Sequence, residues 1–409
     1  MRKTLKQSIL SGAGRTNRFG PGLVLLAFLA FISIGLPDGL LGVAWPSMRA
    51  TFLRPLDAVA LLLLSAMAGY LISSFLSGAI INRTSTGTLL AVSCSLTGGA
   101  LMGYALASYW WMMVLCAFCA GIGSGAIDAG INNYVEENYG KRLMQWLHAS
   151  YGVGITLGPF IMTAGINRFN SWRLGYMVVG FFQLILAGLF FWSIPLWRKG
   201  ARHQQRISPK MHQTRTVPIW NTVQQGSVWV SMMLFFFYAG AEATLGMWAY
   251  TVFTESRGIH HELAGTMTGL YWASFTVGRF AAGFITRHFR PYMLIRSSFL
   301  MALGSTLLLC WRGSALLSVV SVVLTGFAIA PVYPALVSET SDRVSGRHKA
   351  HAIGLQIGAA GLGATLLSGL AGVLARQLSL EIIPVYMIIL FLILIGLYEL
   401  AVRRQKAEI

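Results

Sequence analysis

The sequence predicts an all-α polytopic membrane protein of twelve transmembrane helices in two pseudo-symmetric six-helix halves. Composition, the length of the apolar segments and an internal repeat predict this fold class. Of the 409 residues 55% are hydrophobic and only 11% are charged, and the mean hydropathy is +0.64. Soluble domains carry about 25% charged residues, so this composition excludes a soluble enzyme, a disordered chain and a single-pass receptor.

Twelve apolar segments follow one another along the chain, and a helix that crosses a bilayer needs roughly 20 such residues. The first follows a basic N-terminus and is too long for a cleaved signal peptide, so it is an uncleaved span. The predicted spans are 21–48, 58–82, 88–108, 110–135, 143–167, 172–196, 227–253, 262–286, 291–311, 313–337, 350–375 and 381–402. They divide the chain into an N-terminal six-helix half (1–196), a linker (197–226) and a C-terminal six-helix half (227–409).

The basic residues predict the orientation, because cytoplasmic loops retain Lys and Arg. The linker 197–226 is basic and has no apolar periodicity, which indicates a cytoplasmic connection. With the N-terminus inside, most of the 31 Lys and Arg residues lie on that side. The opposite side then holds Arg49, Arg54, Arg168, Arg173, Arg257, Arg312 and Arg376. We therefore expect a multi-pass cell-membrane protein with both termini cytoplasmic, in a bacterial inner membrane.

The two halves resemble each other in sequence at a constant offset of about half the chain. Asp38-Gly-Leu-Leu-Gly42 in the first span matches Glu242-Ala-Thr-Leu-Gly246 in the seventh, and Gly121 matches Gly326. Since each half has an even number of spans, the repeat is parallel, as in transporters whose halves are related by an axis along the membrane normal.

Few charged residues lie well inside the spans: Asp38, Asp128, Glu242 and Arg279. A charge at the bilayer centre costs at least ~2.5–3.5 kcal/mol on insertion scales. The functional interpretation is a water-accessible cavity in which the acids bind substrate or carry a proton. The structural interpretation pairs each acid with Arg, His or backbone N–H groups beside a helix break, as Pro37 and Gly39 suggest for Asp38.

Further polar and aromatic residues complete the candidate site. Asp128 and Asn132 are spaced i, i+4 and share a helix face, which suits hydroxyl groups. His148 is a candidate proton carrier with Asp38 and Asp128, or a packing residue. The expected substrate-binding residues are Asp38, Asp128, Asn132, Glu242, Trp248, Tyr271 and Gln356, and Trp272 joins the aromatics as a wall for a sugar ring or as core.

The sequence contains no phosphate loop, metal cluster or Gly-x-Ser-x-Gly motif, so we expect no enzyme activity, no cofactor and no metal site. Cys116-x-x-Cys119 has the spacing of a metal or redox motif but only apolar neighbours, so both cysteines are predicted to be core residues.

The chain resembles the major facilitator superfamily. The loop after the second span of that family, Gly-x-x-x-Asp-Arg-x-Gly-Arg, appears as Gly78-Ala-Ile-Ile-Asn82-Arg83-Thr-Ser-Thr-Gly87, with Asn82 in place of the acid. The resemblance implies a gating role for Arg83. For Arg279, which follows Gly278 near the cytoplasmic end of its span, we expect a structural or gating role.

Within that superfamily the chain is similar to the fucose permease and sodium-dependent glucose transporter group. The resemblance rests on Gly123-Ser-Gly125-Ala-Ile-Asp128-Ala-Gly130-Ile-Asn132 and on Leu147-His148-Ala-Ser-Tyr-Gly152-Val-Gly154. It implies that Asp38 and Asp128 serve proton coupling and sugar recognition. Asp128 replaces the Glu of the permease and is closer to the glucose-transporter version.

The expected function is a secondary transporter for a sugar or similar small polar solute, by proton symport with alternating access. H⁺ is the expected coupling ion, and Na⁺ is the alternative. A proton-coupled efflux antiporter for cationic or lipophilic compounds is the competing transport hypothesis, and a non-transporting membrane sensor or assembly partner is the third. The expected partners are a small-molecule substrate and the lipid bilayer, with no nucleic acid, and the expected state is a monomer.

Overall fold

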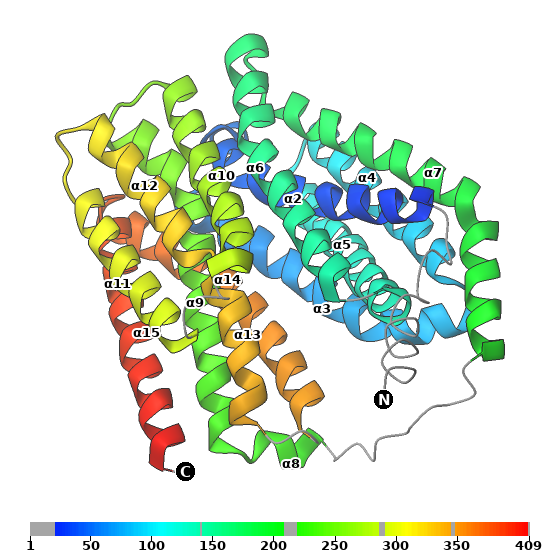
Figure 1. Ribbon diagram of the computed structural model, residues 1–409. Helices are drawn as coiled ribbons and strands as arrows, with labels where there is room; N and C mark the ends of the chain where they lie inside the picture. Colours follow the sequence, from blue (N-terminus) through cyan, green and yellow to red (C-terminus); the bar gives the residue numbers. More distant parts are fainter. Residues whose placement is uncertain (1–20, 140, 208–218, 286–290, 345–347, 408–409) are drawn as a thin grey trace.

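The apolar segments of the sequence form long helices in the computed structural model, which describes residues 21–139, 141–207, 219–285, 291–344 and 348–407 (Figure 1). The first half consists of α2 (Pro21–Thr51), the short 3₁₀ turn η1 (Leu56–Ala58), α3 (Val59–Arg83), α4 (Thr86–Leu106), α5 (Trp110–Asn138), α6 (Lys141–Phe169) and α7 (Trp172–Ile207). Ten of the basic residues used for orientation lie outside the described residues: Arg2, Lys3, Lys6, Arg15, Arg18, Lys210, Arg215, Arg287, Arg290 and Arg347.

The second half begins after the short helix α8 (Ile219–Val223). It consists of α9 (Gly226–Thr251), the π-helical turn η2 (Val252–Ser256), α10 (His261–Ile285), α11 (Pro291–Leu309), α12 (Ala315–Ile329), α13 (Val332–Arg343), α14 (Lys349–Gln377) and α15 (Ile382–Ala407). The predicted span 313–337 is thus α12 and α13, which are interrupted just before Val332, at Pro331.

Eleven helices of the described chain are long and apolar enough to cross a membrane. They agree with eleven of the twelve predicted spans. The remaining predicted span, 262–286, corresponds to the 25-residue helix α10, which packs between α6 and α12 among the others. The fold is therefore the predicted all-helical membrane fold.

Two details differ from the expectations. Helix α7 continues to Ile207, well into the segment 197–226 that the sequence predicts as a linker without regular structure. Helix α2 continues through Pro37 and Pro46 without a break, although Pro37 and Gly39 suggest a loosened helix around Asp38. The glycines of α2 serve packing instead, since Cβ atoms on Gly35 and Gly39 would meet backbone oxygens of Tyr151 and Ile155 on α6.

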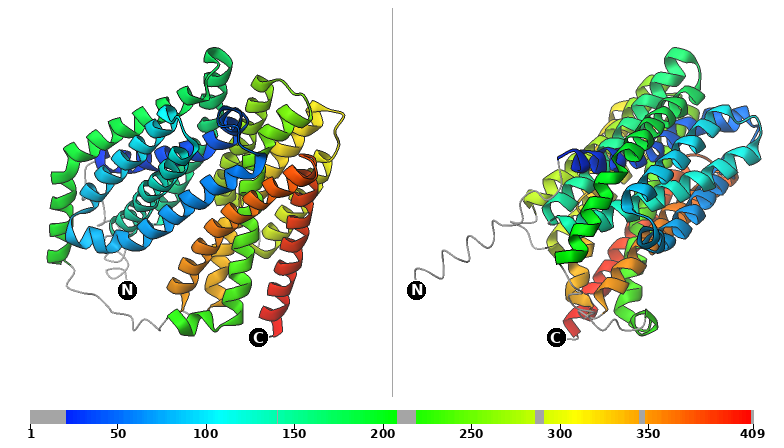
Figure 2. Two further views of the ribbon diagram at one scale, coloured as in Figure 1. Left: turned by 180° about the vertical axis from the view of Figure 1, so that it is seen from behind. Right: turned by 90° about the vertical axis from the view of Figure 1, so that its right-hand side faces the viewer.

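The two halves converge at one end of the molecule and diverge at the other (Figures 1 and 2). Helices of the two halves pack together in the pairs α2–α9, α3–α14 and α6–α10. Helices α2 and α9 lie close together at Gly42, where a Cβ would lie 2.6 Å from the carbonyl oxygen of Gly246. Small residues allow such close helix contacts in membranes.

We call the end that carries η1 and η2 the closed end, and the end that carries α8 the open end. Two ion pairs join the halves at the closed end. Arg49 Nη2 lies 2.6 Å from Glu255 Oε2, and Arg376 Nη1 lies 3.0 Å from Asp57 Oδ1. The open end is where the two groups of helices spread apart in Figure 1.

Candidate functional site

A cavity of about 1300 Å³ lies between the two halves. It extends from Met247 and Ser368 in the core to Glu136, Tyr139 and Gln145 near the connection of α5 to α6. Of the residues singled out from the sequence, its walls include Asp38, Asp128, Asn132, His148, Trp272, Arg279 and Gln356. The described structure therefore gathers candidate residues from five helices, α2, α5, α6, α10 and α14, around one space.

Asp128 on α5 has hydrogen-bond donors on both carboxylate oxygens. Tyr70 Oη on α3 donates to Oδ2 at 2.5 Å, and Asn132 Nδ2, one turn along α5, donates to Oδ1 at 2.9 Å. The two helices come close enough because Gly125 has no side chain, and a Cβ there would lie 2.5 Å from the Tyr70 carbonyl oxygen. Asn132 thus reaches Asp128 as the i, i+4 spacing predicts, and its Oδ1 is buried without a partner.

Asp38 on α2 is held in a similar way by a tyrosine of another helix. Tyr151 Oη on α6 donates to Asp38 Oδ2 at 2.7 Å. The glycine contacts of Gly35 and Gly39 bring α2 against α6 and so bring the two side chains together. Both candidate acids of the first half, Asp38 and Asp128, are therefore held by tyrosine hydroxyls that lie on neighbouring helices.

Glu242 and Arg279 form an ion pair within the second half, with 3.8 Å between Oε1 and Nη2. The Arg279 guanidinium lies over the Phe275 ring, 4.3 Å from its centroid, and Nε is buried without a partner. Arg279 lines the cavity, whereas Glu242 is not among the lining residues.

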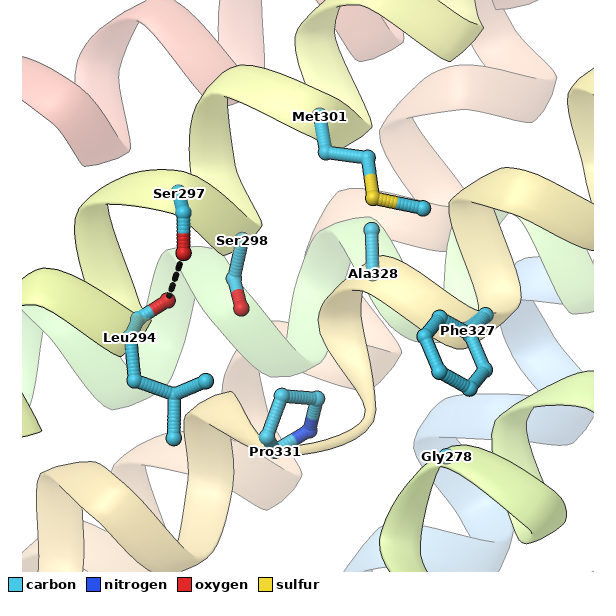
Figure 3. Close-up of a pocket in the computed structure, with 8 residues that line it drawn as sticks. All are labelled: Gly278, Leu294, Ser297, Ser298, Met301, Phe327, Ala328 and Pro331. Atoms are coloured by element: carbon cyan, nitrogen blue, oxygen red, sulfur yellow. Dashed lines mark hydrogen bonds between the residues drawn. The ribbon is translucent and has the colours of Figure 1, made fainter. Parts of the chain in front are cut away.

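Gly278 fixes the position of α10 beside this ion pair. A Cβ on Gly278 would lie 2.7 Å from the Ala330 Cβ, so α10 and the end of α12 are in close contact. A separate niche of about 130 Å³ lies there, lined by Gly278, Leu294, Ser297, Ser298, Met301, Phe327, Ala328 and Pro331 (Figure 3). Its mostly apolar lining offers little for polar chemistry, and we assign it no role.

His148 on α6 lines the cavity near the middle of its charged groups. Its ring packs edge-on against Phe31 at 5.5 Å, and it is close enough to Asp128 and Arg279 for their charges to interact. The proximity of His148 to Asp128 is what a shared proton-carrying role requires.

Three candidates are engaged by protein groups. Trp248 is fully buried and its Nε1 donates to the Ser368 carbonyl at 2.9 Å, while Tyr271 donates to the Glu242 carbonyl at 2.8 Å; neither is among the lining residues. Gln356 lines the cavity but is fully buried and bonded to Thr340, with Nε2 2.9 Å from Oγ1. Arg83 is exposed at the end of α3, away from the lining residues.

The tyrosines Tyr70 and Tyr151 were not candidates from the sequence. Each lies in an apolar span, and each meets its carboxylate from a different helix, so no spacing along the chain reveals the contact. Tyr333 on α13 also lines the cavity. Tyr151 does lie inside the sequence motif around His148, but that motif does not identify its partner.

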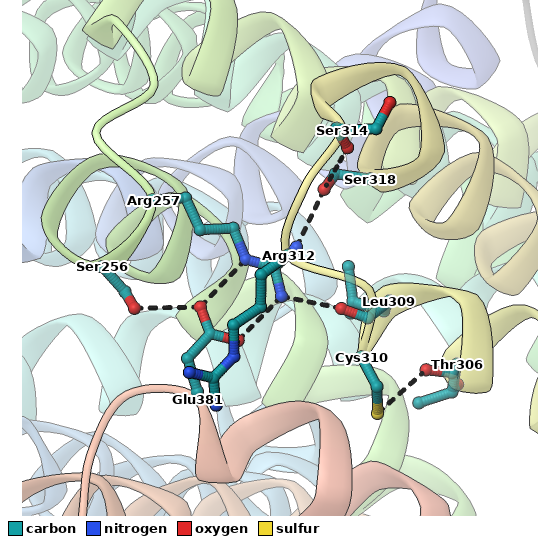
Figure 4. A network of polar contacts seen from close by, with 9 residues as sticks. All are labelled: Ser256, Arg257, Thr306, Leu309, Cys310, Arg312, Ser314, Ser318 and Glu381. Carbon is teal, nitrogen blue, oxygen red and sulfur yellow. Dashed lines mark hydrogen bonds and ion pairs between the residues drawn. The ribbon is translucent and has the colours of Figure 1, made fainter.

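A second polar cluster lies at the closed end, away from the cavity (Figure 4). Glu381 accepts hydrogen bonds from Arg257 Nη2 at 2.8 Å and from Ser256 at 2.9 Å, and Arg257 also donates to Ser318 at 2.8 Å and to the Leu309 carbonyl at 2.7 Å. Burial alone would raise the pKa of Glu381, but the donors from Arg257 and Ser256 and the nearby Arg312 outweigh it. The pKa lies below its ordinary value of 4.5.

No group of three or more His, Cys, Asp or Glu in the described part of the chain could hold a metal ion. A cavity between two helical bundles that meet at one end, with a few charged and polar side chains in a largely apolar wall, is typical of a membrane transporter. The family model of the Major Facilitator Superfamily matches residues 23–295 and 230–408. The chain belongs to that family, so it is a secondary transporter and not an enzyme.

The similar proteins include several sugar transporters. The glucose/mannose transporter GlcP of Bacillus subtilis is 22% identical over 399 residues, which cover 95% of this chain and 96% of GlcP. Human sodium-dependent glucose transporter 1 is 22% identical over 315 residues, covering 68% of this chain and 60% of that protein.

Solved structures share the fold. The nucleoside transporter NupG superposes with a TM-score of 0.75 at 14% identity, covering 92% of this chain and 98% of NupG. A bacterial homolog of the lysosomal transporter Spinster, in an inward-facing and unoccupied conformation, gives a TM-score of 0.77 at 15% identity, with 93% and 96% of the two chains covered.

Proposed function

We propose that this transporter carries a sugar or similar small polar solute across the membrane by proton symport with alternating access. The observation that carries the proposal is the pair of acids, Asp38 and Asp128, in the cavity wall. Each is held by a hydroxyl donor, and no ion pair to either is found among the described residues. Carboxylate and amide groups that share a wall with tyrosines suit a solute rich in hydroxyl groups, and GlcP is named for glucose and mannose.

The roles follow from these positions. Asp38, Asp128 and His148 exchange the coupling proton, and Asp128 with Asn132 contacts the solute. The same binding site is held in place by Glu242, Trp248, Tyr271 and Gln356. Arg83 is proposed to act in gating. H⁺ is the proposed coupling ion, with Na⁺ as the alternative that the experiment below distinguishes.

The open end is proposed to face the cytoplasm, as are both termini. The connections at that end carry most of the basic residues, which cytoplasmic loops retain. The described shape is then inward-facing, and the chain is proposed to act as a monomer with 1–196 and 227–409 as its moving halves. A bacterial inner membrane is the proposed location.

The first experiment is a thermal-shift screen of the purified protein in detergent. It compares hexoses, hexitols, organic acids and lipophilic cations at pH 5.5 and 7.5, with and without Na⁺. Ligands that bind only the folded state raise the melting temperature by mass action. We expect a hexose or hexitol to raise it in a pH-dependent manner. If only lipophilic cations raise the melting temperature, the result would contradict sugar symport and support the proton-coupled efflux antiporter.

The second experiment tests the coupling in proteoliposomes with the solute that the screen identifies. We expect Asp128→Asn to abolish accumulation against a gradient while exchange across the membrane continues, because the amide cannot carry a proton. Glu399→Gln is the matched control, since Glu399 pairs with Arg296 outside the cavity lining at 2.6 Å. Undiminished accumulation by Asp128→Asn would contradict the coupling role.

A further inference from the structure

The cavity wall contains one hydrogen-bond acceptor and one hydrogen-bond donor that lack a partner among the described residues, and they come from opposite halves. Asn132 Oδ1 on α5 and Arg279 Nε on α10 are both buried, and both lack a partner among the described residues. With Asp128 ionised, its carboxylate only accepts hydrogen bonds and so takes the Nδ2 group of Asn132, which leaves Oδ1 free.

Arg279 is positioned as a rigid but incompletely paired cation. Its contact with Glu242 at 3.8 Å is longer than a hydrogen bond, and Phe275 covers one face of the guanidinium at 4.3 Å. Gly278, the residue directly before Arg279, packs α10 closely against the end of α12. Nε of Arg279 therefore retains hydrogen-bonding capacity beside the cavity that this residue lines.

Asn132 and Arg279 both line the cavity. Asn132 is bonded to Asp128, and His148 is close enough to both Asp128 and Arg279 for their charges to interact. Buried polar atoms of a protein usually have a partner, so two unsatisfied atoms of residues that line one cavity indicate a place that a ligand completes.

We propose that Asn132 and Arg279 form a subsite that spans the two halves and reads two hydroxyl groups of a neutral polyhydroxylated solute. One hydroxyl donates to Asn132 Oδ1 and the other accepts from Arg279. Glu242 is a positioning residue that holds Arg279 in place. This inference rests on the proposed function and changes the role of Arg279 from gating to direct recognition.

The subsite selects by charge as well as by shape. A cationic group is repelled by Arg279, and a carboxylate can accept from Arg279 but has no proton to donate to Asn132. A hydroxyl group is both donor and acceptor and satisfies either position. Because α5 and α10 belong to different halves, the solute also becomes a link between them.

The test measures binding of sugars that lack single hydroxyl groups. The probes are D-glucose, D-mannose and D-sorbitol, the monodeoxy derivatives of the tightest-binding hexose, and acetate and tetramethylammonium as charged controls without hydroxyl groups. For wild type we expect two deoxy positions to weaken binding about 10- to 100-fold each, the range for hydrogen bonds to polar and charged groups. Acetate and tetramethylammonium should bind weakest.

The variants then assign each hydroxyl to its residue. In Arg279→Lys we expect about 10-fold or weaker binding of the parent sugar, and one of the two deoxy derivatives should bind as well as the parent. Asn132→Ser should remove the sensitivity at the other position. The neutral double variant Glu242→Gln/Arg279→Gln avoids an unpaired buried charge and should repeat the Arg279→Lys pattern if that variant folds poorly.

Arg296→Lys is the matched control, since Arg296 also pairs with a glutamate, Glu399, but lies outside the cavity lining. It should bind every probe like wild type. If wild type binds and Arg279 variants keep both deoxy sensitivities, the subsite is wrong while the proposed function stands. If wild type binds none of the hydroxylated probes, the proposed function fails and the subsite fails with it.

Discussion

The acids of the two halves have different kinds of partner. Asp38 and Asp128 accept hydrogen bonds from tyrosine hydroxyls, which carry no charge. Glu242, which matches Asp38 in the internal repeat, instead faces the guanidinium of Arg279. The repeat therefore conserves an acid in the first helix of each half while the partner differs. This asymmetry favours proton exchange in the first half and a fixed charge pair in the second.

The tyrosine partners mark the limit of sequence-based prediction at the residue scale. The i, i+4 contact of Asp128 with Asn132 follows from helix geometry alone and is confirmed. The contacts of Tyr70 and Tyr151 depend on how α3 and α6 pack on other helices. That packing depends on glycines such as Gly125, whose neighbours across the interface are not readable from spacing.

Glu381 is the residue for which we predict an acid-sensitive contribution to stability. Its folded pKa is below 4.5, so its contribution is complete above that ordinary value and is lost as the pH falls through the lower folded value. Glu381→Gln should lower the free energy of unfolding by about 3–5 kcal/mol near neutral pH, because it leaves Arg257 buried and unpaired. Glu381→Gln should also weaken the pH dependence of the melting temperature in the acidic range.

The measurement is the melting temperature in detergent between pH 3.5 and 7.5. Glu399→Gln serves as the comparison, since its ion pair with Arg296 is partly exposed, with side-chain exposures of 35% and 41%, and such pairs contribute about 0–1 kcal/mol. Equal pH dependence of Glu381→Gln and wild type below pH 4.5 would contradict the assignment.

At the scale of elements, the π-helical turn η2 connects the contacts of the closed end. It carries Glu255, which pairs with Arg49 of the other half, and it is followed by Arg257, which pairs with Glu381 in its own half. π-Helical turns are rare and occur frequently at functional sites. The ion pair of Arg257 with Glu381, two residues away, keeps Glu255 within reach of Arg49 on α2. The turn η2 therefore couples the packing within the second half to the ion pair between the halves.

The two ion pairs between the halves, Arg49–Glu255 and Arg376–Asp57, should stabilise the shape that is closed at this end. Removing both with Glu255→Gln/Asp57→Asn should raise the population opened at the closed end several-fold, because partly exposed pairs contribute about 0.2–1 kcal/mol each. The readout is the labelling rate of Thr365→Cys, a cavity position, in a background without native cysteines, with a membrane-impermeant maleimide added at the closed end.

Glu399→Gln in the same background is the control, since it breaks an ion pair within one half. Labelling at the wild-type rate in the double variant would mean that the apolar contacts of α2 with α9 close this end without help from the ion pairs.

For the whole molecule, the sequence predicts the fold class well and its boundaries less well. Apolar length and the repeat suffice for the helices and for two six-helix halves, since a bilayer imposes one length on every span. The extension of α7 to Ile207 is polar and carries no apolar signal, so the sequence assigns it to the linker. Which end of the molecule is open depends on how one half packs on the other, and the hydropathy of the sequence does not predict this packing.

Transport requires the halves to separate at the closed end, and a covalent link there should stop it. A Cβ on Gly369 of α14 would lie 3.1 Å from the Ala60 Cβ of α3, near the separation that a disulfide needs. In a background without native cysteines, Ala60→Cys/Gly369→Cys should form a disulfide between the halves. Oxidation should then abolish uptake into proteoliposomes, and a reductant should restore it.

Solute binding should survive oxidation, because the linked protein keeps its cavity open at the other end. The two single-cysteine variants, oxidised in the same way, control for damage by the oxidant. Because the disulfide joins α3 to α14 without touching the cavity acids, loss of uptake with retained binding assigns the defect to the movement of the halves. Uptake at the wild-type rate by fully cross-linked protein would mean that α3 and α14 do not separate during transport.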